Sequence, residues 1–143
     1  MRQRLSWQSV VAFLALVLLL GCSPKAKNDP ATTEVTENLR VLANAYLAAT
    51  QKNNRPPKGP EELKPFLPRG VTDDKVYRSA RDGEPFVVIW GADPRKGMDV
   101  KPMVIAYEKT GKGGERTVFT AMGVMTMTND NFTKANFPPG HKP

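Results

Sequence analysis

The sequence predicts an α+β fold in which one long N-terminal helix packs on a small three- to four-stranded antiparallel sheet. The first observation is an apolar stripe at helical spacing, formed by Val35, Leu39, Leu42 and Tyr46. The second is a later series of short apolar and β-branched segments separated by Gly-containing turns, which is typical of an antiparallel meander. The third is that Cys22 is the single cysteine of the chain, so an apolar core and not disulfides must stabilise the fold.

The chain begins with a segment that has the features of a signal peptide. Arg2 and Arg4 give it a positive start, and an uninterrupted apolar run extends from Val10 to Leu20. As a helix this run would be about 17 Å long, which is short of the roughly 30 Å of bilayer hydrocarbon. The run therefore indicates the core of a signal peptide and not a membrane-spanning helix.

The order Leu19-Leu20-Gly21-Cys22 resembles the lipobox of bacterial lipoproteins. That resemblance implies cleavage before Cys22, lipid attachment to Cys22, and residues 1–21 as the signal peptide. Several acyl chains would hold the protein at a membrane. A free thiol beside an ordinary signal peptide and an uncleaved anchor are the alternatives. Ser23 stands where an aspartate would favour the inner membrane in related lipoproteins, so we expect the outer membrane where a cell has two.

Residues 22–32 are polar and interrupted by prolines, and we expect them to form a flexible tether to a domain over residues 33–137. Asp29 is a candidate N-cap of the long helix, with Pro30 at its first position, and Thr33 is a second candidate. The helix is expected to end near Asn53.

Short elements are expected to follow the long helix. Pro60 is predicted to start a helix of one to two turns that ends at Leu67. Strands are predicted over 86–90, 103–108, 116–120 and 124–127. Thr128 or Asn129 is predicted to cap a terminal helical turn that carries Phe132, and residues 138–143 are predicted to be an irregular tail.

This layout resembles the bacterial type II secretion pseudopilins. The residues that carry the resemblance are the segment 39–46, Arg55-Pro56-Pro57, Glu61-Glu62-Leu63 and Trp90-Gly91, and the stretch 105–119 is similar to pilin-like exported proteins. The resemblance implies a pilin-like domain linked to secretion or pilus-type assemblies. The chain departs from the family in having a lipobox and only the soluble half of the helix, so polymerisation like a pilin is not expected.

The resemblance alone suggests a calcium site, because some pseudopilins bind calcium in a late loop. Asp93 and Asp99 lie in a loop here, but Arg95 and Lys96 would repel a cation.

The formal net charge of +7 arises from scattered lysines and arginines. They form no run or dense helical stripe, and an exported protein rarely meets nucleic acid, so no nucleic-acid partner is expected. Weak attraction to anionic lipid or a cell-wall polymer is the better interpretation.

The sequence offers no catalytic arrangement and predicts that the protein is not an enzyme and has no cofactor. His141 is the single histidine and lies in the proline-rich tail, where we expect it to be solvated and unable to serve a nucleophile. Carboxylate pairs such as Glu61-Glu62 stand at helix starts or turns, where acidic residues are expected in any case.

The methionines allow an alternative function, that of a copper(I)-binding lipoprotein of the periplasm. Met122, Met125 and Met127 are the candidate ligands, because thioethers are soft donors. The competing interpretation is that Met125 and Met127 share one strand face and pack on the long helix.

The favoured hypothesis is a membrane-anchored envelope lipoprotein with a non-catalytic interaction or structural domain. The membrane is its first partner, through the N-terminal lipid, and an envelope protein or cell-wall polymer is the second. Binding is expected at an exposed sheet edge or at the loop over residues 91–102.

Overall fold

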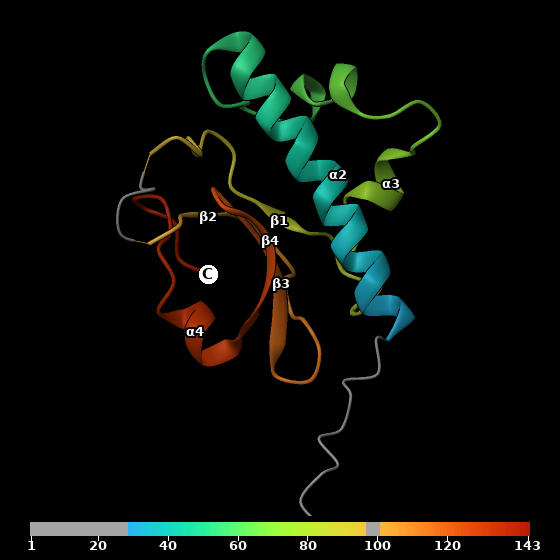
Figure 1. The fold of residues 1–143 in the computed structure, drawn as a ribbon, viewed down its shortest axis with the longest axis vertical. Coiled ribbons are helices and arrows are strands. Elements are labelled where there is room, and N and C mark those ends of the chain that lie inside the picture. Colours follow the sequence, from blue (N-terminus) through green and yellow to red (C-terminus); the bar gives the residue numbers. More distant parts are fainter. Residues whose placement is uncertain (1–28, 97–100) are drawn as a thin grey trace, which may run out of the picture.

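The computed structural model describes residues 29–96 and 101–143 (Figure 1). The predicted signal peptide, Cys22 and residues 23–28 of the tether lie outside the described residues. The elements in chain order are α2 (Pro30–Asn53), the 3-10 turns η1 (Pro60–Glu62) and η2 (Lys64–Phe66), α3 (Asp73–Val76), β1 (Val87–Val88), β2 (Val104–Tyr107), β3 (Glu115–Thr120), β4 (Gly123–Thr128) and α4 (Asn129–Thr133). A long helix packed against a four-stranded antiparallel sheet confirms the predicted fold class.

Helix α2 begins where its capping residues predict. The Asp29 carboxylate accepts a hydrogen bond of 3.1 Å from the Ala31 N–H, and Pro30 occupies the first helical position. Residues 30–32 therefore form the first turn of α2, which corrects their assignment to the tether. At the other end Asn54 adopts a left-handed conformation with φ of 50° and donates its N–H to the Gln51 carbonyl.

None of the described helices combines the length and the apolarity that a bilayer crossing requires.

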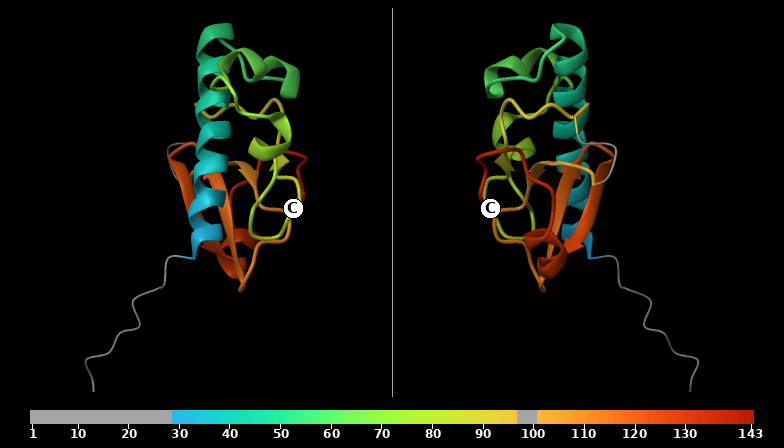
Figure 2. Two further views of the ribbon diagram at one scale, coloured as in Figure 1. Left: turned by 90° about the vertical axis from the view of Figure 1, so that its right-hand side faces the viewer. Right: turned by 90° about the vertical axis from the view of Figure 1, so that its left-hand side faces the viewer.

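The core lies between α2 and one face of the sheet. Val35, Leu39, Leu42 and Tyr46 are fully buried, which confirms the stripe that their spacing predicts. Their partners on the sheet and in the segment before it belong to the same apolar cluster: Phe86, Ile105, Ala106, Phe119 and Val124. Figure 2 shows β3 and β4, in orange, lying against α2.

The sheet is a meander of order β1-β2-β3-β4, so β4 is an edge strand. The predicted strand over 86–90 is shorter than expected and contains only Val87–Val88. Phe86 donates its N–H to the Tyr77 carbonyl at 2.7 Å, and Ile89 donates to the Ile105 carbonyl at 2.8 Å. Ile89 thus adds a hydrogen bond to β2 beyond the strand, whereas Phe86 bonds outside the sheet and Trp90 lies in a turn.

The opposite face of the sheet is covered by α4 and the C-terminal segment. Tyr107, Val118 and Phe132 form a second apolar cluster, and Met125 and Met127 pack against it. The prediction that these methionines pack on the long helix is therefore wrong. Side chains alternate along β4, and it is the Val124 face that α2 covers.

The expected helix over residues 59–67 is divided into η1 and η2. Pro65 has no N–H, so an α-helix through this segment would lack one of its hydrogen bonds. Leu63, at the junction of the two turns, is fully buried and ties the segment to the core. The short helix α3 was not anticipated by the sequence pattern.

Candidate functional site

Three places in the described residues bring polar or charged side chains together. The first is buried under the loop that precedes β1. The Glu108 carboxylate accepts hydrogen bonds from the Ser79 hydroxyl at 2.7 Å, from the Thr117 N–H at 2.6 Å and from two nitrogens of Arg81. Glu108 is 0% exposed and the Arg81 side chain 4%. Both carboxylate oxygens are satisfied, so the cluster fastens the loop to the sheet.

Two opposing effects act on the pKa of Glu108. Burial acts to raise it, whereas the hydrogen bonds from Arg81, Ser79 and Thr117 favour the charged form. The hydrogen bonds prevail together, and the pKa lies below the ordinary value of 4.5. A carboxylate held in this way remains ionised and is a poor general acid at neutral pH.

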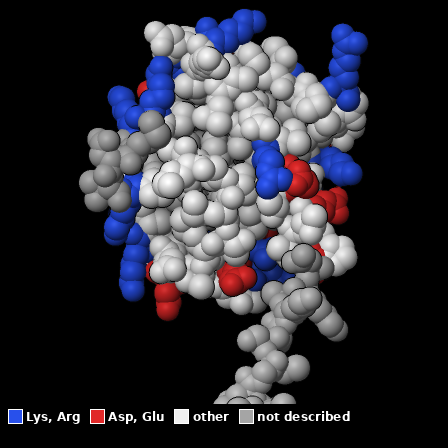
Figure 3. Space-filling model, viewed as in Figure 1, with Lys and Arg blue, Asp and Glu red and all other residues white. Residues whose placement is uncertain are grey.

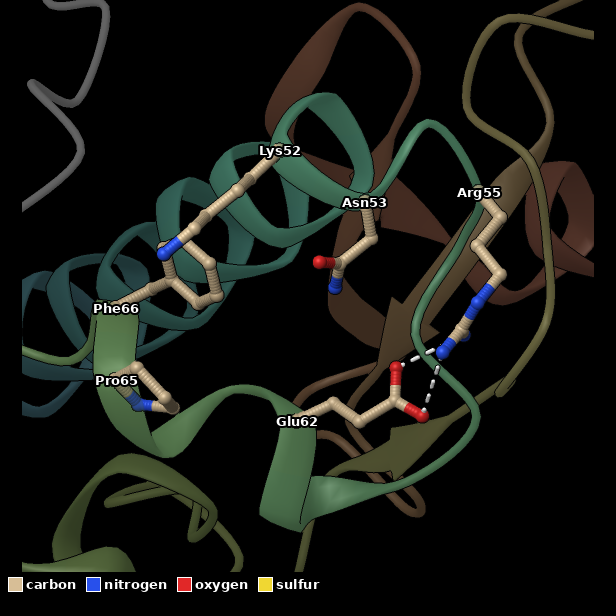
Figure 4. Close-up of a pocket in the computed structure, with 6 residues that line it drawn as sticks. All are labelled: Lys52, Asn53, Arg55, Glu62, Pro65 and Phe66. Atoms are coloured by element: carbon tan, nitrogen blue, oxygen red, sulfur yellow. Dashed lines mark hydrogen bonds and ion pairs between the residues drawn. The ribbon is translucent and has the colours of Figure 1, made fainter.

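The second place is a cleft of about 290 Å³ between the C-terminal end of α2 and the η2 turn (Figure 4). Arg55 points toward Glu62 and forms two hydrogen bonds with its carboxylate, of 3.0 and 3.3 Å. Lys52 lies over the Phe66 ring at 5.6 Å from its centroid. Both cations already have partners inside the protein. We therefore interpret these contacts as stabilising the packing of α2 against the 3-10 turns.

The third place consists of two adjoining hollows, which we name the paired hollows. Each has a volume of about 450 Å³, and both are lined by Asn136. The residues lining the first are Lys101, Pro102, Met125, Thr126, Met127, Asn131, Lys134, Ala135 and Asn136. Those lining the second are Gly91, Ala92, Asp93, Lys96, Met103, Asn136, Phe137, Pro138 and Pro139.

The chain places Asn136 between the hollows by means of backbone pairing. Asn136 forms a parallel bridge with Met103, and its carbonyl accepts the Val104 N–H at 2.8 Å. Its side-chain amide donates to the Lys101 carbonyl at 3.1 Å. The C-terminal segment thus runs on beside β2 and forms a wall common to both hollows.

The paired hollows are lined by more apolar than polar surface, and lysines contribute to the lining of both. Lys101 and Lys134 are exposed, and neither forms an ion pair with any described residue. Asp93 is held by Arg95, whose hydrogen bonds lower the pKa of Asp93 below its ordinary value. Figure 3 shows a broad area without charged side chains near the centre of this face, with Lys and Arg side chains along its left-hand edge.

The structure separates the candidate copper ligands. Met125 and Met127 both line the first hollow, but Met122 lies in the β3–β4 turn, is 72% exposed and does not line it. Among residues 29–96 and 101–143, no three His, Cys, Asp or Glu side chains are grouped so that they could hold a metal ion. Asp99, the second acid of the calcium expectation, lies outside the described residues.

His141 is not the solvated tail residue that the sequence predicts. Its Nε2 lies 3.0 Å from the Tyr107 hydroxyl, and its ring packs against Phe137 with the ring centroids 5.6 Å apart. The predicted irregular tail therefore folds back on the sheet because aromatic side chains of β2, α4 and the tail pack together.

Sequence reasoning missed both the Glu108 cluster and the paired hollows. Arg81, Lys101 and Lys134 stand in the sequence as scattered bases, and no local pattern marks their neighbours. The loop over residues 91–102 was predicted as a binding element. Its described parts, from Gly91 to Lys96 and at Lys101 and Pro102, do contribute to the lining of the hollows.

Comparison of the chain with protein-family models, curated proteins and solved structures found no match.

Proposed function

We propose that this chain is a lipid-anchored protein of the bacterial cell envelope whose domain is a non-catalytic binding module, with the paired hollows as its binding face. The observation that carries the proposal is the combination, on one face, of two mainly apolar hollows with Lys101 and Lys134, which form no ion pair with any described residue. Apolar surface with a few charged groups at its rim is typical of an interaction site.

The position of the anchor supports this orientation. The predicted lipid at Cys22 would reach the domain through the N-terminal end of α2, because the chain enters that helix at its cap, Asp29. In Figure 1 this end of α2, in blue, and the C-terminal segment that lines both hollows, in red, lie on opposite sides of the molecule. A tether at α2 therefore leaves the binding face free to meet a partner.

The titratable side chains support binding more than catalysis. Glu108, Glu62 and Asp93 are each paired with an arginine, and Asp82 accepts three backbone hydrogen bonds, from Glu84, Thr110 and Gly111. Groups held in this way stabilise the fold and are not poised to exchange protons.

The α+β layout is the one that the resemblance to pseudopilins predicts, and it supports a role beside secretion or pilus-type assemblies. Fold similarity by itself does not specify function, so the partner must be identified by experiment. An envelope protein and a cell-wall polymer are the two classes to distinguish.

Site-specific photo-crosslinking in intact cells of the native bacterium tests the proposal. A photoreactive amino acid replaces Asn131, which is exposed and lines the first hollow, in one strain and, as a control, the exposed Lys112 of the β2–β3 turn in another. We expect a crosslinked envelope component from position 131 only, and its loss when Cys22→Ser removes the anchor. Equal crosslinking from both positions, or none from position 131, would contradict the proposed binding face.

A second candidate function, copper(I) binding, is supported by the shared location of Met125 and Met127 in the first hollow. Lys101 and Lys134 line the same hollow and disfavour copper binding, because they repel a cation. Titration of the full chain with copper(I) tests this candidate, with Met125→Leu as the variant expected to weaken binding. Equal binding by both proteins would exclude the site.

A further inference from the structure

The edge of β4 carries backbone groups that are free to bind. The pairing of Thr120 with Gly123 closes a two-residue turn, so the paired residues alternate in hydrogen bonding along the ladder. Met125 then exchanges hydrogen bonds with Val118, whereas the N–H and C=O of Thr126 point away from β3. No described residue forms a hydrogen bond with these groups of Thr126, and Thr126 is exposed.

This edge lacks the usual protection against pairing with another chain. Exposed edge strands normally carry lysine, proline or a bulge. Strand β4 contains six residues, Gly123–Thr128, none of them charged and none proline, and the ladder with β3 shows no register shift. At its start Met122 is 72% exposed and adds an apolar contact.

The first of the paired hollows opens at the same place. Thr126 lines this hollow together with Lys101 and Lys134. A segment running along β4 would therefore place one of its side chains beside two positive groups that form no ion pair within residues 29–96 and 101–143. A carboxylate is the group that complements them.

We propose that β4 is a docking edge, on which an extended polypeptide segment of the partner pairs as a fifth strand and inserts an acidic side chain between Lys101 and Lys134. Main-chain hydrogen bonds to Thr126 supply affinity, and the lysines supply selectivity for an acidic sequence. This inference rests on the proposed function, of which it specifies the partner's chemistry.

The test uses the full chain in nanodiscs of neutral lipid and a fluorescent heptapeptide of alternating valine and glutamate. A peptide with lysine in place of glutamate is its matched control. Fluorescence anisotropy measures the affinity, and amide hydrogen exchange measures protection at Thr126. We expect the acidic peptide to bind at least about tenfold more tightly than the basic one and to slow exchange of the Thr126 N–H.

Two protein variants separate the backbone contribution from the charge contribution. Thr126→Pro removes the outward N–H at a position where an edge strand accepts proline, and we expect about tenfold weaker binding. Thr126→Ala keeps the N–H and should bind within about twofold of the native chain. The double variant Lys101→Glu and Lys134→Glu should abolish the preference for the acidic peptide, whereas Lys112→Glu should leave it unchanged.

Binding without protection at Thr126, or equal binding by the proline and alanine variants, would overturn the inference. So would concentration-dependent dimerisation of the free chain that protects Thr126, because a second copy would then occupy the edge. If crosslinking at position 131 captures a partner while the peptide series fails, only the docking mode is wrong. If crosslinking fails while the peptide series succeeds, the cellular function is wrong and the edge remains a peptide site.

Discussion

Arg81 and Glu108 lie 27 positions apart in the chain and form an ion pair in which both side chains are almost completely buried. Ser79 and the Thr117 N–H complete the donors around the carboxylate. Water does not reach this pair and cannot solvate a charge that loses its partner. Removal of one charge therefore leaves the other buried and unpaired. The pair therefore joins the loop before β1 to the β2–β3 ladder.

The first prediction concerns this pair. Glu108→Gln should lower the free energy of unfolding by about 3–5 kcal/mol, because it leaves the Arg81 guanidinium buried without a counter-charge. Urea denaturation of the full chain measures the change. The matched control is Glu84→Gln, which removes an ion pair with Lys109 whose side chains are 45% and 60% exposed, and which should cost at most about 1 kcal/mol. Similar losses for the two variants would show that the Glu108 pair is not buried as described.

The second prediction is a loss of stability in acid. Hydrogen bonds lower the pKa of Glu108 below its ordinary value of 4.5 and that of Asp82 below 3.8, although burial opposes both shifts. A group with a lowered pKa stabilises the fold fully above its ordinary pKa, and this contribution disappears as the pH falls through the folded value.

The free energy of unfolding should therefore decrease as the pH falls below about 4.5, and the decrease should be shallower in Asp82→Asn. Denaturant titrations at successive pH values measure it. An identical pH dependence for the native chain and this variant would contradict the role of Asp82.

The third prediction uses two glycines of one hairpin. A Cβ at Gly111 would lie 2.2 Å from the Glu115 carbonyl oxygen, whereas a Cβ at Gly113 would meet no atom within 4 Å. Their φ angles are +72° and +66°, so alanine at either position is strained by about 1–2 kcal/mol. Gly111→Ala should be more destabilising than Gly113→Ala by at least about 1 kcal/mol, because the backbone must also move. Equal melting temperatures would refute this close approach.

The fourth prediction concerns Tyr46, whose hydroxyl donates to the Ala92 carbonyl at 2.8 Å. Tyr46→Phe should lower the free energy of unfolding by about 0.5–1.5 kcal/mol. Leu47→Ala, at a position 40% exposed on the same helix, should change it by less than about 0.5 kcal/mol.

Tyr46 also predicts a loss of stability in alkali. Burial raises its pKa above the ordinary value of 10.0, so the unfolded chain releases this proton at a lower pH than the folded one. The stabilisation is complete below pH 10 and decreases above it. Tyr46→Phe should make this alkaline decrease shallower, and Tyr107, whose pKa burial also raises, should account for part of the remainder. An unchanged profile between pH 9 and about 11 would show that Tyr46 ionises normally in the fold.

The sequence was sufficient for the elements whose signals are local. Asp29 caps α2, and Leu39 and Leu42 are buried as their spacing predicts. It was insufficient where partners are distant in the chain. Glu108 is the last residue of a predicted strand, a position at which a charged side chain is usually exposed. Nothing near it in the sequence identifies Arg81 as its partner.

The methionines show a different limit. Alternation along β4 establishes that Met125 and Met127 share a face, but not which face α2 covers. That choice depends on how the β3–β4 hairpin is placed under the helix, and here Val124 packs with the α2 cluster. The candidate site depends on the same choice, because only this placement brings the methionines beside Lys101 and Lys134.

The exchange rate of the Thr126 amide in the free chain tests the central claim of an open binding edge most directly. In dilute solution, hydrogen exchange followed by NMR should show Thr126 exchanging at least about a hundredfold faster than Met125, whose N–H is paired with Val118 across the ladder. Exchange at Thr126 as slow as at Met125 would mean that the edge is already covered, and the account of β4 as a docking strand would be contradicted.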